Sequence, residues 1–417
     1  IRGIVQSAAL ALVLFVGACA EPPLPEWHDE GDYRWREVRV PRGSDVGFTS
    51  LESSRTGLDF VNAVQTSDAL ANRHLTHGSG VALGDVDGDG RVDVLLARLS
   101  GPNALYRNLG GWRFEDATER SGIAAPDRLS TGAVLADVDG DGDLDLLLTA
   151  LGGPNALFVN DGSGVFTEEE DGALASESGS TTMTLADVEG DGDLDLYVTN
   201  YKAVSALDAL PPERRTFDSV VEQVDGSYRV RSGYERDFRV FERPDLGSVI
   251  YVQRAEADAF YLNDGRGGFV LQPFTGGRFL DEDGAPLTEP PDLFGLSARF
   301  YDVTGDGAPD LYVANDFEDP DQFWINDGNG IFRAAPRLAL RSTSNAAMAV
   351  DFADIDRDGD VDFFEVDMLS RDRRLRMTQT PTHTALPKQI GMIGDRPQRM
   401  RNALFLNRGD GTFAQIA

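Results

Sequence analysis

Short apolar runs alternate with acidic, glycine-rich turns along most of this chain. A mainly apolar run stands before each of five such turns, as at 81–83 and 133–135, and another follows, as at 94–96 and 146–148. Short apolar runs bounded by turn residues are typical of β-strands. The pattern therefore predicts pairs of strands joined by acidic turns, in an all-β fold.

Two further strands are predicted in each unit. A third apolar stretch ends in an asparagine, and a glycine-rich turn then leads to a phenylalanine that opens a fourth. The asparagines are Asn108, Asn160, Asn263, Asn326 and Asn407. The phenylalanines are Phe114, Phe166, Phe269, Phe332 and Phe413. Four short strands per repeat are the signature of a β-propeller blade.

The spacing of the turns locates two insertions. The turns begin at residues 85, 137, 187, 302 and 354, so successive starts are 52, 50, 115 and 52 residues apart. The asparagine markers attribute the long gap to one blade with an insertion at 201–258, and they place a second insertion at 368–401. We expect the propeller to occupy 48–417, with five visible blades.

A propeller needs closure, because an open arc leaves sheet edges exposed. We expect seven blades in the complete circle and a natural protein that continues past residue 417. The segment Gly47, Phe48 and Thr49 resembles the fourth strand of a blade. Our hypothesis is that it completes the last blade.

The five turns share the pattern Asp-x-Asp-x-Asp-Gly-x-x-Asp or a close variant. Carboxylates this close repel one another, and a calcium ion, which takes six to eight oxygen ligands, would relieve the repulsion. Side chains at positions 1, 3, 5 and 9 and the backbone carbonyl at position 7 would bind it, while the glycine at position 6 permits the turn. The alternative is an acidic turn without metal.

The predicted ligands of the five structural calcium sites follow in chain order. They are Asp85, Asp87, Asp89, Arg91 and Asp93; Asp137, Asp139, Asp141, Asp143 and Asp145; Asp187, Glu189, Asp191, Asp193 and Asp195; Asp302, Thr304, Asp306, Ala308 and Asp310; and Asp354, Asp356, Asp358, Asp360 and Asp362. Loop four has Thr304 at position 3 and should bind most weakly. Loop five has Arg357 at position 4, where the other loops have glycine.

The acidic turn followed by Asn-Asp-Gly-x-Gly-x-Phe resembles the FG-GAP (VCBS-type) repeats of integrin-like propellers. More narrowly, the segments 78–84, 277–284 and 366–373 resemble the bacterial branch of the cartilage acidic protein family. The resemblance implies a calcium-stabilised propeller that is secreted or attached to a surface. Members of that family often carry a C-terminal ASPIC/UnbV domain, which is not visible in this chain.

The N-terminus predicts export. Arg2, an apolar stretch and Val16-Gly17-Ala18-Cys19 resemble a bacterial lipoprotein signal, which would span 1–18 and place a lipid on Cys19. The proline- and charge-rich residues 19–47 would form a tether. We expect a lipoprotein of the outer membrane or cell surface that touches the membrane through its lipid only. The alternative is an ordinary secretory signal and a secreted or periplasmic protein.

Composition narrows the partners. The chain has 417 residues, 41% of them apolar, and a formal net charge of -32. It is therefore globular, and we expect no nucleic-acid partner because phosphate binding needs a basic surface. The segment 371–401 is an exception, because it is basic and could be a solvated strap or a docking patch. Its cations are Arg371, Arg373, Arg374, Arg376, Lys388, Arg396, Arg399 and Arg401.

Function is predicted as a binding or adhesion module for protein or carbohydrate, without catalytic residues. The competing interpretation is a polysaccharide lyase or hydrolase with a channel site, to which Asp281, Glu282 and Asp283 could contribute. A third is a scaffold for a further domain. His74 and His77 could be half of a metal site or ordinary loop residues. The aromatic residues of the first insertion could form a binding face or a small core.

Overall fold

The computed structural model describes residues 28–29, 34–35, 48–169, 172, 174–243, 247–317, 319–379 and 397–416. It divides into two compact units, Ile1–Leu51 and Glu52–Ala417. In the first unit, β1 (His28–Asp29) pairs with β2 (Arg34–Trp35). The predicted signal peptide, Cys19 and most of the tether lie outside the described residues.

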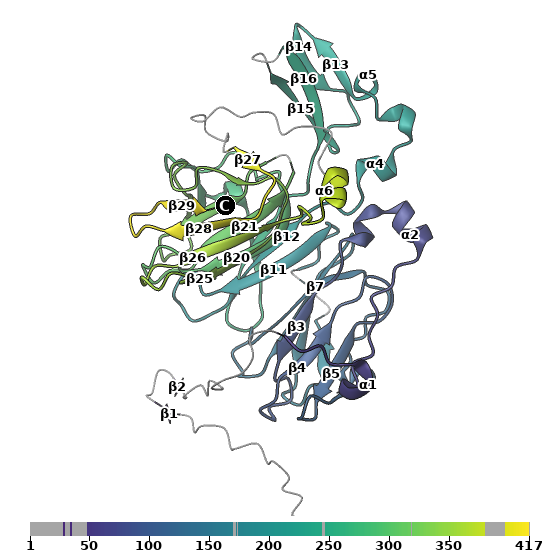
Figure 1. Ribbon diagram of the computed structural model, residues 1–417, viewed down its shortest axis with the longest axis vertical. Helices are drawn as coiled ribbons and strands as arrows, with labels where there is room; N and C mark the ends of the chain where they lie inside the picture. The colour runs from purple at the N-terminus through teal and green to yellow at the C-terminus, as the bar shows by residue number, and fades with distance from the viewer. Residues whose placement is uncertain are drawn as a thin grey trace, which may run out of the picture. The chain divides into compact units, whose positions relative to one another are not determined.

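Five antiparallel sheets follow one another in the second unit and form successive propeller blades (Figure 1). Blade one contains β3 (Val81–Gly84), β4 (Asp93–Leu96), β5 (Ala104–Asn108) and β6 (Phe114–Asp116). Blade two contains β7 (Ser130–Ala136), β8 (Asp145–Ala150), β9 (Ala156–Asn160) and β10 (Phe166–Glu168). Blade three contains β11 (Ser180–Ala186), β12 (Asp195–Asn200), β17 (Ala259–Leu262) and β18 (Val270–Gln272).

The last two blades follow the same order. Blade four contains β20 (Phe294–Tyr301), β21 (Asp310–Asp316), β22 (Gln322–Asn326) and β23 (Phe332–Ala334), and β19 (Phe279–Leu280) adds a parallel strand beside β23. Blade five contains β25 (Ala347–Ala353), β26 (Asp362–Asp367), β28 (Ala403–Asn407) and β29 (Phe413–Ile416). The short β24 (Thr343–Ser344) pairs with β27 (Gln398–Arg399). The predicted all-β fold of four-stranded blades is confirmed.

Helices are short and lie in the connections. They are α1 (Ser53–Thr56), α2 (Thr66–Ala71), η1 (Arg73–Thr76), α3 (Thr118–Ser121), α4 (Ala206–Ala209), η2 (Pro212–Arg214), α5 (Phe217–Val220), η3 (Phe274–Gly276) and α6 (Arg373–Gln379). Within the described ranges, none is long and apolar enough to cross a lipid bilayer.

The first insertion folds on its own core between β12 and β17. It contains two hairpins, β13 (Val221–Val224) with β14 (Ser227–Val230), and β15 (Phe238–Arg243) with β16 (Ser248–Gln253), drawn in teal in Figure 1. Phe238 and Val220 are buried, and the rings of Tyr228, Tyr234 and Tyr251 pack around them. These aromatic residues therefore form a small core, although Phe241 is partly exposed beneath Arg239.

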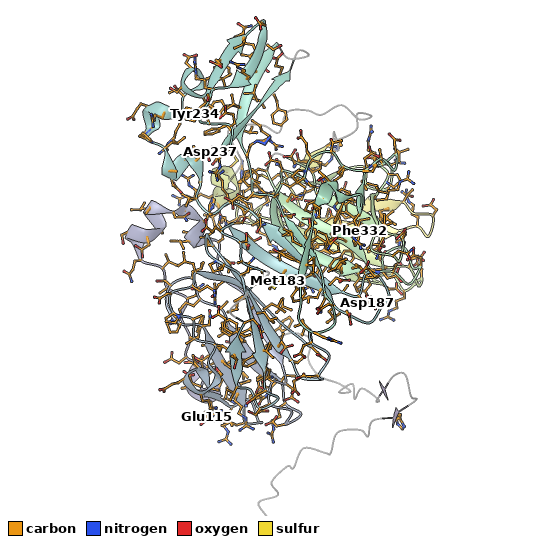
Figure 2. All side chains as sticks on the ribbon, turned by 180° about the vertical axis from the view of Figure 1, so that it is seen from behind. Glu115, Met183, Asp187, Tyr234, Asp237 and Phe332 are labelled. Carbon is orange, nitrogen blue, oxygen red and sulfur yellow. The ribbon has the colours of Figure 1, made fainter. Side chains whose placement is uncertain are left out.

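The main core lies between the blades. The first strands of the blades, β3, β7, β11, β20 and β25, lie beside one another in that order. Each neighbouring pair of blades shares one apolar cluster, as where Leu95 of blade one packs with Phe158 of blade two. Figure 2 labels Phe332, which is buried in the cluster between blades three and four. A fully buried side chain of this size contributes roughly 1.5–3 kcal/mol.

The aspartate at position 9 of each turn ties three segments of its blade together. Asp145 is fully buried, and its Oδ2 accepts the backbone N–H of Val138 at 3.2 Å while its Oδ1 accepts that of Asn160 at 2.9 Å. The same two bonds recur at Asp93, Asp195, Asp310 and Asp362. Each turn is thereby fixed to the end of the third strand.

The asparagine that ends the third strand then reaches into the preceding blade. The Nδ2 of Asn160 donates to the carbonyl of Val86 at 2.9 Å, and Asn263 bonds Val138 in the same way at 2.8 Å. Asn326 and Asn407 repeat this contact with loops three and four. We call this contact the cross-blade bond. Its acceptor is position 2 of the turn, so every covered turn is part of a blade–blade interface.

The outer face of blade five differs from its equivalents. Ile355, at position 2 of its turn, is 48% exposed, and Phe364 is 40% exposed. Their equivalents in blades one to four are at most 3% exposed, because the next blade covers them. These are Val86, Val138, Val188 and Val303 for Ile355, and Leu95, Leu147, Tyr197 and Tyr312 for Phe364. Within the described residues, no blade covers this face.

The hypothesis about the segment before the first blade is wrong for the residues that the structure describes. Phe48 and Thr49 lie in no strand, and the Phe48 side chain is fully exposed. A strand needs a partner edge to satisfy its backbone groups, and the apolar Gly-Phe-Thr pattern does not supply one by itself.

A second recurrent polar group closes the connection from the second to the third strand. In blade two the Oδ1 of Asn155 accepts the backbone N–H of Ala150 at 2.9 Å. Asp258 takes this place in blade three, where it accepts the N–H of Asn200 at 2.7 Å and the hydroxyl of Tyr197 at 2.8 Å. Burial raises the pKa of Asp258 to about 7.

We expect Asn160→Ala to destabilise the fold more than Asn108→Ala. The first change leaves the buried carbonyl of Val86 without its donor, at a cost of about 1–3 kcal/mol. The Nδ2 of Asn108 donates to Val92 of its own exposed turn, so that variant is the matched control. Chemical unfolding measures the difference, and equal midpoints for the two variants would contradict a special role for the cross-blade bond.

We expect Asp258→Asn to remove a pH dependence from the stability. Between the unfolded pKa near 4 and the folded pKa of about 7, the folded chain holds a proton that the unfolded chain lacks. Stability therefore falls as the pH rises through this window, by on the order of 1 kcal/mol per unit. The asparagine variant should gain stability over the natural chain between pH 5 and pH 8. Parallel unfolding curves at the two pH values would refute this assignment.

Candidate functional site

The acidic turns are shaped by hydrogen bonds to their first aspartate. In loop two, Asp137 accepts the N–H groups of Gly140 at 2.8 Å and Gly142 at 3.1 Å. Positions 4 and 6 of every loop have positive φ, which glycine adopts without strain. Arg357 takes this conformation at position 4 of loop five, with φ of 67°. The backbone is therefore arranged around position 1 in all five loops.

Three loops gather carboxylates in a geometry that could hold a metal ion. In each of these clusters, oxygens from positions 1, 3 and 9 lie within 4.8 Å of one another. The clusters are Asp85, Asp87 and Asp93; Asp137, Asp139 and Asp145; and Asp354, Asp356 and Asp362. Carboxylates packed this closely repel one another, and a hard cation, which prefers oxygen ligands, would stabilise them. The donor set of loops one, two and five fits calcium.

Position 9 can serve the fold and a cation together. A carboxylate has about four lone-pair sites, and the two backbone N–H groups occupy only two of them. Burial, with the charges of Asp139 and Asp141 added, raises the pKa of Asp145 to about 6. Burial also raises the pKa of Asp195 and of Asp310 to about 6. A nearby cation would favour the charged form of each group.

Position 5 lies outside the three clusters. The side chains of Asp89, Asp141, Asp191, Asp306 and Asp358 each accept the N–H of position 7 in their own loop. The residues at position 7 are Arg91, Asp143, Asp193, Ala308 and Asp360. In loops one, two and five the structure therefore brings together positions 1, 3 and 9, whereas position 5 supports the turn.

Loops three and four show no such cluster among the described residues. At loop three, Glu189 pairs with Arg278 at 2.9 Å, and it is not in a group of three carboxylates with Asp187 and Asp195. At loop four, Thr304 has no charge, and its backbone N–H donates to Asp310 at 3.0 Å. Glu189 is therefore engaged by Arg278, whereas the side chain of Thr304 stays close to Asp310, to which it hydrogen-bonds.

Loop one holds two guanidinium groups beside its carboxylates. Arg107, on β5, pairs with Asp87 and lies 3.1 Å from Asp89, and Arg91 lies 2.7 Å from Asp89. The equivalent of Arg107 in blade two is Val159, so loop two has no such competitor on its third strand. The positive charges of Arg91 and Arg107 beside these aspartates should oppose the approach of a metal ion. The sequence pattern of the loops did not reveal this competition.

The opposite ends of the inner strands surround a cavity of about 730 Å³. The loops follow the last residues of these strands, whereas the cavity is lined by their first residues, such as Thr131, Thr181 and Met348. Figure 2 shows this separation along blade three, with Asp187 and Asp237 on opposite sides of Met183. The metal loops and the cavity thus lie on different faces.

The two histidines noted in the sequence belong to this cavity. Their rings stack 5.0 Å apart, and each meets the ring of Tyr201 edge-on. The Nδ1 of His74 lies 2.6 Å from the carbonyl of Lys202. Within the described residues, His74 and His77 are not part of a group of three metal-binding side chains. They therefore act as packing and wall residues in this structure.

The other predicted candidates are dispersed. Asp281 accepts N–H groups of its own turn, and Glu282 accepts that of Arg337. In the basic insertion, Arg371, Arg373 and Arg374 are exposed on and before α6. Lys388, Arg396 and His383 lie outside the described residues. Sequence reasoning missed Tyr201, Phe317 and the small hydroxyl residues of the cavity, because no local motif marks them.

The chain contains FG-GAP-like repeats. The FG-GAP-like repeat family matches residues 85–148, 137–198 and 302–364, which include loops one to five. These matches confirm the expected repeat type. The matched residues include the acidic turns and two of the asparagines that make cross-blade bonds, Asn160 and Asn326.

Part of the chain is also similar to cartilage acidic protein 1. It is 32% identical to the human protein and 31% identical to the mouse protein, over 84 residues in each case. The matched part is 20% of this chain and 13% of either relative. The chain therefore spans only a small part of the length of these relatives.

Several solved structures have a similar arrangement at low identity. A protein of Agrocybe aegerita that recognises non-reducing terminal N-acetylglucosamine is 16% identical, with a TM-score of 0.33, over 80% of this chain and 77% of that one. The biofilm matrix protein Bap1 of V. cholerae is 13% identical, with a TM-score of 0.37, over 81% and 38%. The GH43_1 enzyme of Xanthomonas citri is 13% identical, with a TM-score of 0.36, over 81% and 89%. At these values the similarities say nothing about the ligand or activity of this chain.

We expect Arg107→Val to increase the affinity of loop one for a divalent cation. The change removes the guanidinium that pairs with Asp87 and installs the residue found in blade two. The gain should be about tenfold, since one close unit charge near the surface is worth on the order of 1 kcal/mol or more. Calorimetric titration with calcium measures it. Val159→Ala in blade two is the control, and an unchanged affinity in Arg107→Val would remove Arg107 as a competitor.

Proposed function

We propose that this chain of FG-GAP-like repeats is a calcium-stabilised propeller that serves as a binding module for carbohydrate or protein. The observation that carries the proposal is the convergence of three carboxylates in each of loops one, two and five. Calcium bound there would neutralise groups that also hold the blades together. The ion would thus support the fold, and the opposite face would remain available for a ligand.

Stabilisation by calcium follows from the shared residues. Asp93, Asp145 and Asp362 belong both to a cluster and to the bonds that fix the turn to the third strand. An extracellular type of site binds at about 0.1–1 mM. At 1–2 mM calcium, a site of about 0.1 mM affinity adds on the order of 1.5 kcal/mol, if the unfolded chain does not bind.

Binding without catalysis is the role that the polar groups of the cavity favour. The hydroxyls of Ser79 and Thr131 donate to backbone carbonyls of the blades, and His74 is held by the carbonyl of Lys202. A nucleophile would instead need a base within hydrogen-bond reach. We therefore place the carbohydrate lyase or hydrolase second.

Export and lipid attachment at Cys19 complete the proposal. They rest on the sequence of residues 1–19, with its charged start, apolar stretch and Val-Gly-Ala-Cys end. A propeller held at a surface by a tether would meet the calcium concentrations that weak sites need. Incorporation of labelled palmitate in the natural chain, and its loss in Cys19→Ser, would test this part separately.

We expect chelation to lower the unfolding midpoint of residues 20–417 and calcium to restore it. The physical reason is repulsion among the carboxylates of the three clusters once the cation is removed. Thermal unfolding in calcium and in chelator, with bound metal counted by elemental analysis, measures the effect. An unchanged midpoint with little bound metal would overturn the proposal.

Two variants of loop two locate the effect. Asp139→Asn removes a charge from a cluster and should weaken calcium binding at that loop about tenfold. Asp143→Asn keeps the backbone carbonyl of position 7 and lies outside the cluster, so its affinity should stay close to that of the natural chain. Equal losses in the two variants would indicate a general charge effect in place of ligation.

A further inference from the structure

We propose that the cavity at the face opposite the metal loops binds a neutral saccharide, which lies against aromatic side chains on one wall and hydroxyl groups on the other. This inference rests on the proposed binding function and assigns it a site and a ligand class. The cavity of about 730 Å³ lies within the size range of small-molecule sites, about 300–1,000 Å³. Its walls come from the first strand of every blade, from η1 and from the first insertion.

A ring of β-bulges forms the base of the cavity. In blades two to five the register of the first strand shifts at its start, and the bulged residues are Thr131, Thr181, Leu296 and Met348. All four line the cavity, together with Ser79 of blade one. Bulges re-aim side chains and are over-represented next to binding and active sites. Because the bulge recurs in four blades, the base of the cavity is formed by side chains directed in the same way from each blade.

The hydroxyl wall is fixed by bonds to backbone carbonyls, two of which belong to the neighbouring blade. Thr131 donates to the carbonyl of Ser180 at 2.6 Å, and Thr181 donates to the carbonyl of Gly295 at 2.8 Å. Ser79 donates to the carbonyl of Ala97 at 2.7 Å. Their oxygens are thus held in position and retain lone pairs that can accept hydrogen bonds from a ligand.

The other wall is a continuous series of rings. Tyr201 contacts His77 on one side and Phe294 on the other, with centroids 5.0 and 4.9 Å apart. The hydroxyl of Tyr201 donates to Asp316 at 3.0 Å, which fixes the ring. A pyranose presents a C–H face that packs on aromatic rings and a rim of hydroxyls, so both walls match its two kinds of surface.

Phe317 stands at the same cavity in a strained conformation. Its φ is 61°, and its side chain is partly exposed. A bulky residue with positive φ is an outlier, and such strain is concentrated at ligand sites. The backbone N–H of Phe317 donates to Asn345 at 2.9 Å, which holds this conformation. The partly exposed ring of Phe317 therefore lies at the cavity, where a ligand can pack against it.

Charge favours a neutral ligand. Both cations of the wall are already paired, Arg73 with Asp208 at 2.7 Å and Lys202 with Asp237 at 3.3 Å. An anionic ligand would have to break one of these ion pairs to gain a cationic partner. Without such a partner, the cost of removing its charge from water would not be offset. A neutral polyol makes no such demand.

The test is a binding screen of the calcium-loaded chain from residue 20 onward. The probes are neutral oligosaccharides of the gluco, galacto, manno and xylo series, with oligogalacturonates as acidic controls and laurate as an apolar control. Calorimetry then measures the affinity of each saccharide that binds. We expect at least one neutral oligosaccharide to bind and the acidic series not to bind.

Three variants locate the site. Phe317→Gly removes an exposed ring and its strain, and His77→Ala removes an exposed ring of the aromatic wall, so both should keep the fold. Each should weaken binding about tenfold or more, as expected for the loss of an aromatic contact. Trp112→Gly is the matched control, because Trp112 is also exposed with φ of 61° and lies in a turn at the opposite face.

The outcomes separate this inference from the proposed function. Weakened saccharide binding in Phe317→Gly and His77→Ala, with normal binding in Trp112→Gly, supports the cavity as the site. Saccharide binding that none of the variants alters overturns the cavity and leaves the binding function intact. Binding of laurate or oligogalacturonate alone overturns the ligand class. If no probe binds while calcium still raises the unfolding midpoint, the saccharide inference fails and the calcium site stands.

Discussion

The buried aspartate at position 9 is the group on which the rest of this structure depends. It must accept two backbone N–H groups in a place without water, and a buried carboxylate is tolerated only when it is well bonded. One of these two bonds joins the turn to the end of the third strand. The asparagine at that end then bonds to the preceding blade. Local turn chemistry and the packing of blades are therefore one network, and a cation at the turn would act on both.

Repetition explains why much of this was accessible from the sequence. The aspartates and asparagines recur at fixed spacing in every blade, so Asp145 and Asn160 could be recognised by their counterparts. Which loops gather their carboxylates was not accessible, because it depends on partners distant in sequence. Arg107 approaches loop one from β5, and Arg278, which pairs with Glu189 of loop three, lies 89 residues further along the chain.

The cavity could not be predicted for a related reason. Thr131 and Thr181 are ordinary strand residues by type, and only the bulge directs them toward a shared space. Five strand starts, η1 and the insertion must meet before a wall exists, and no single segment carries a motif for it. Phe317 illustrates the point, since its φ of 61° is a property of the folded backbone. Motifs reveal chemistry that is local, whereas pockets are assembled from segments that are distant.

The two faces also differ in how freely they can change over evolutionary time. On the metal face, the connection between the first and second strands spans eight residues in every blade, as at 85–92 and 354–361, and hydrogen bonds to its first aspartate fix its backbone. Connections on the cavity face range from the short segment 151–155 to the hairpins of 201–258. Insertions and deletions can therefore accumulate around the cavity without disturbing the blades. Related chains would diversify in what they recognise while keeping the same mechanical frame.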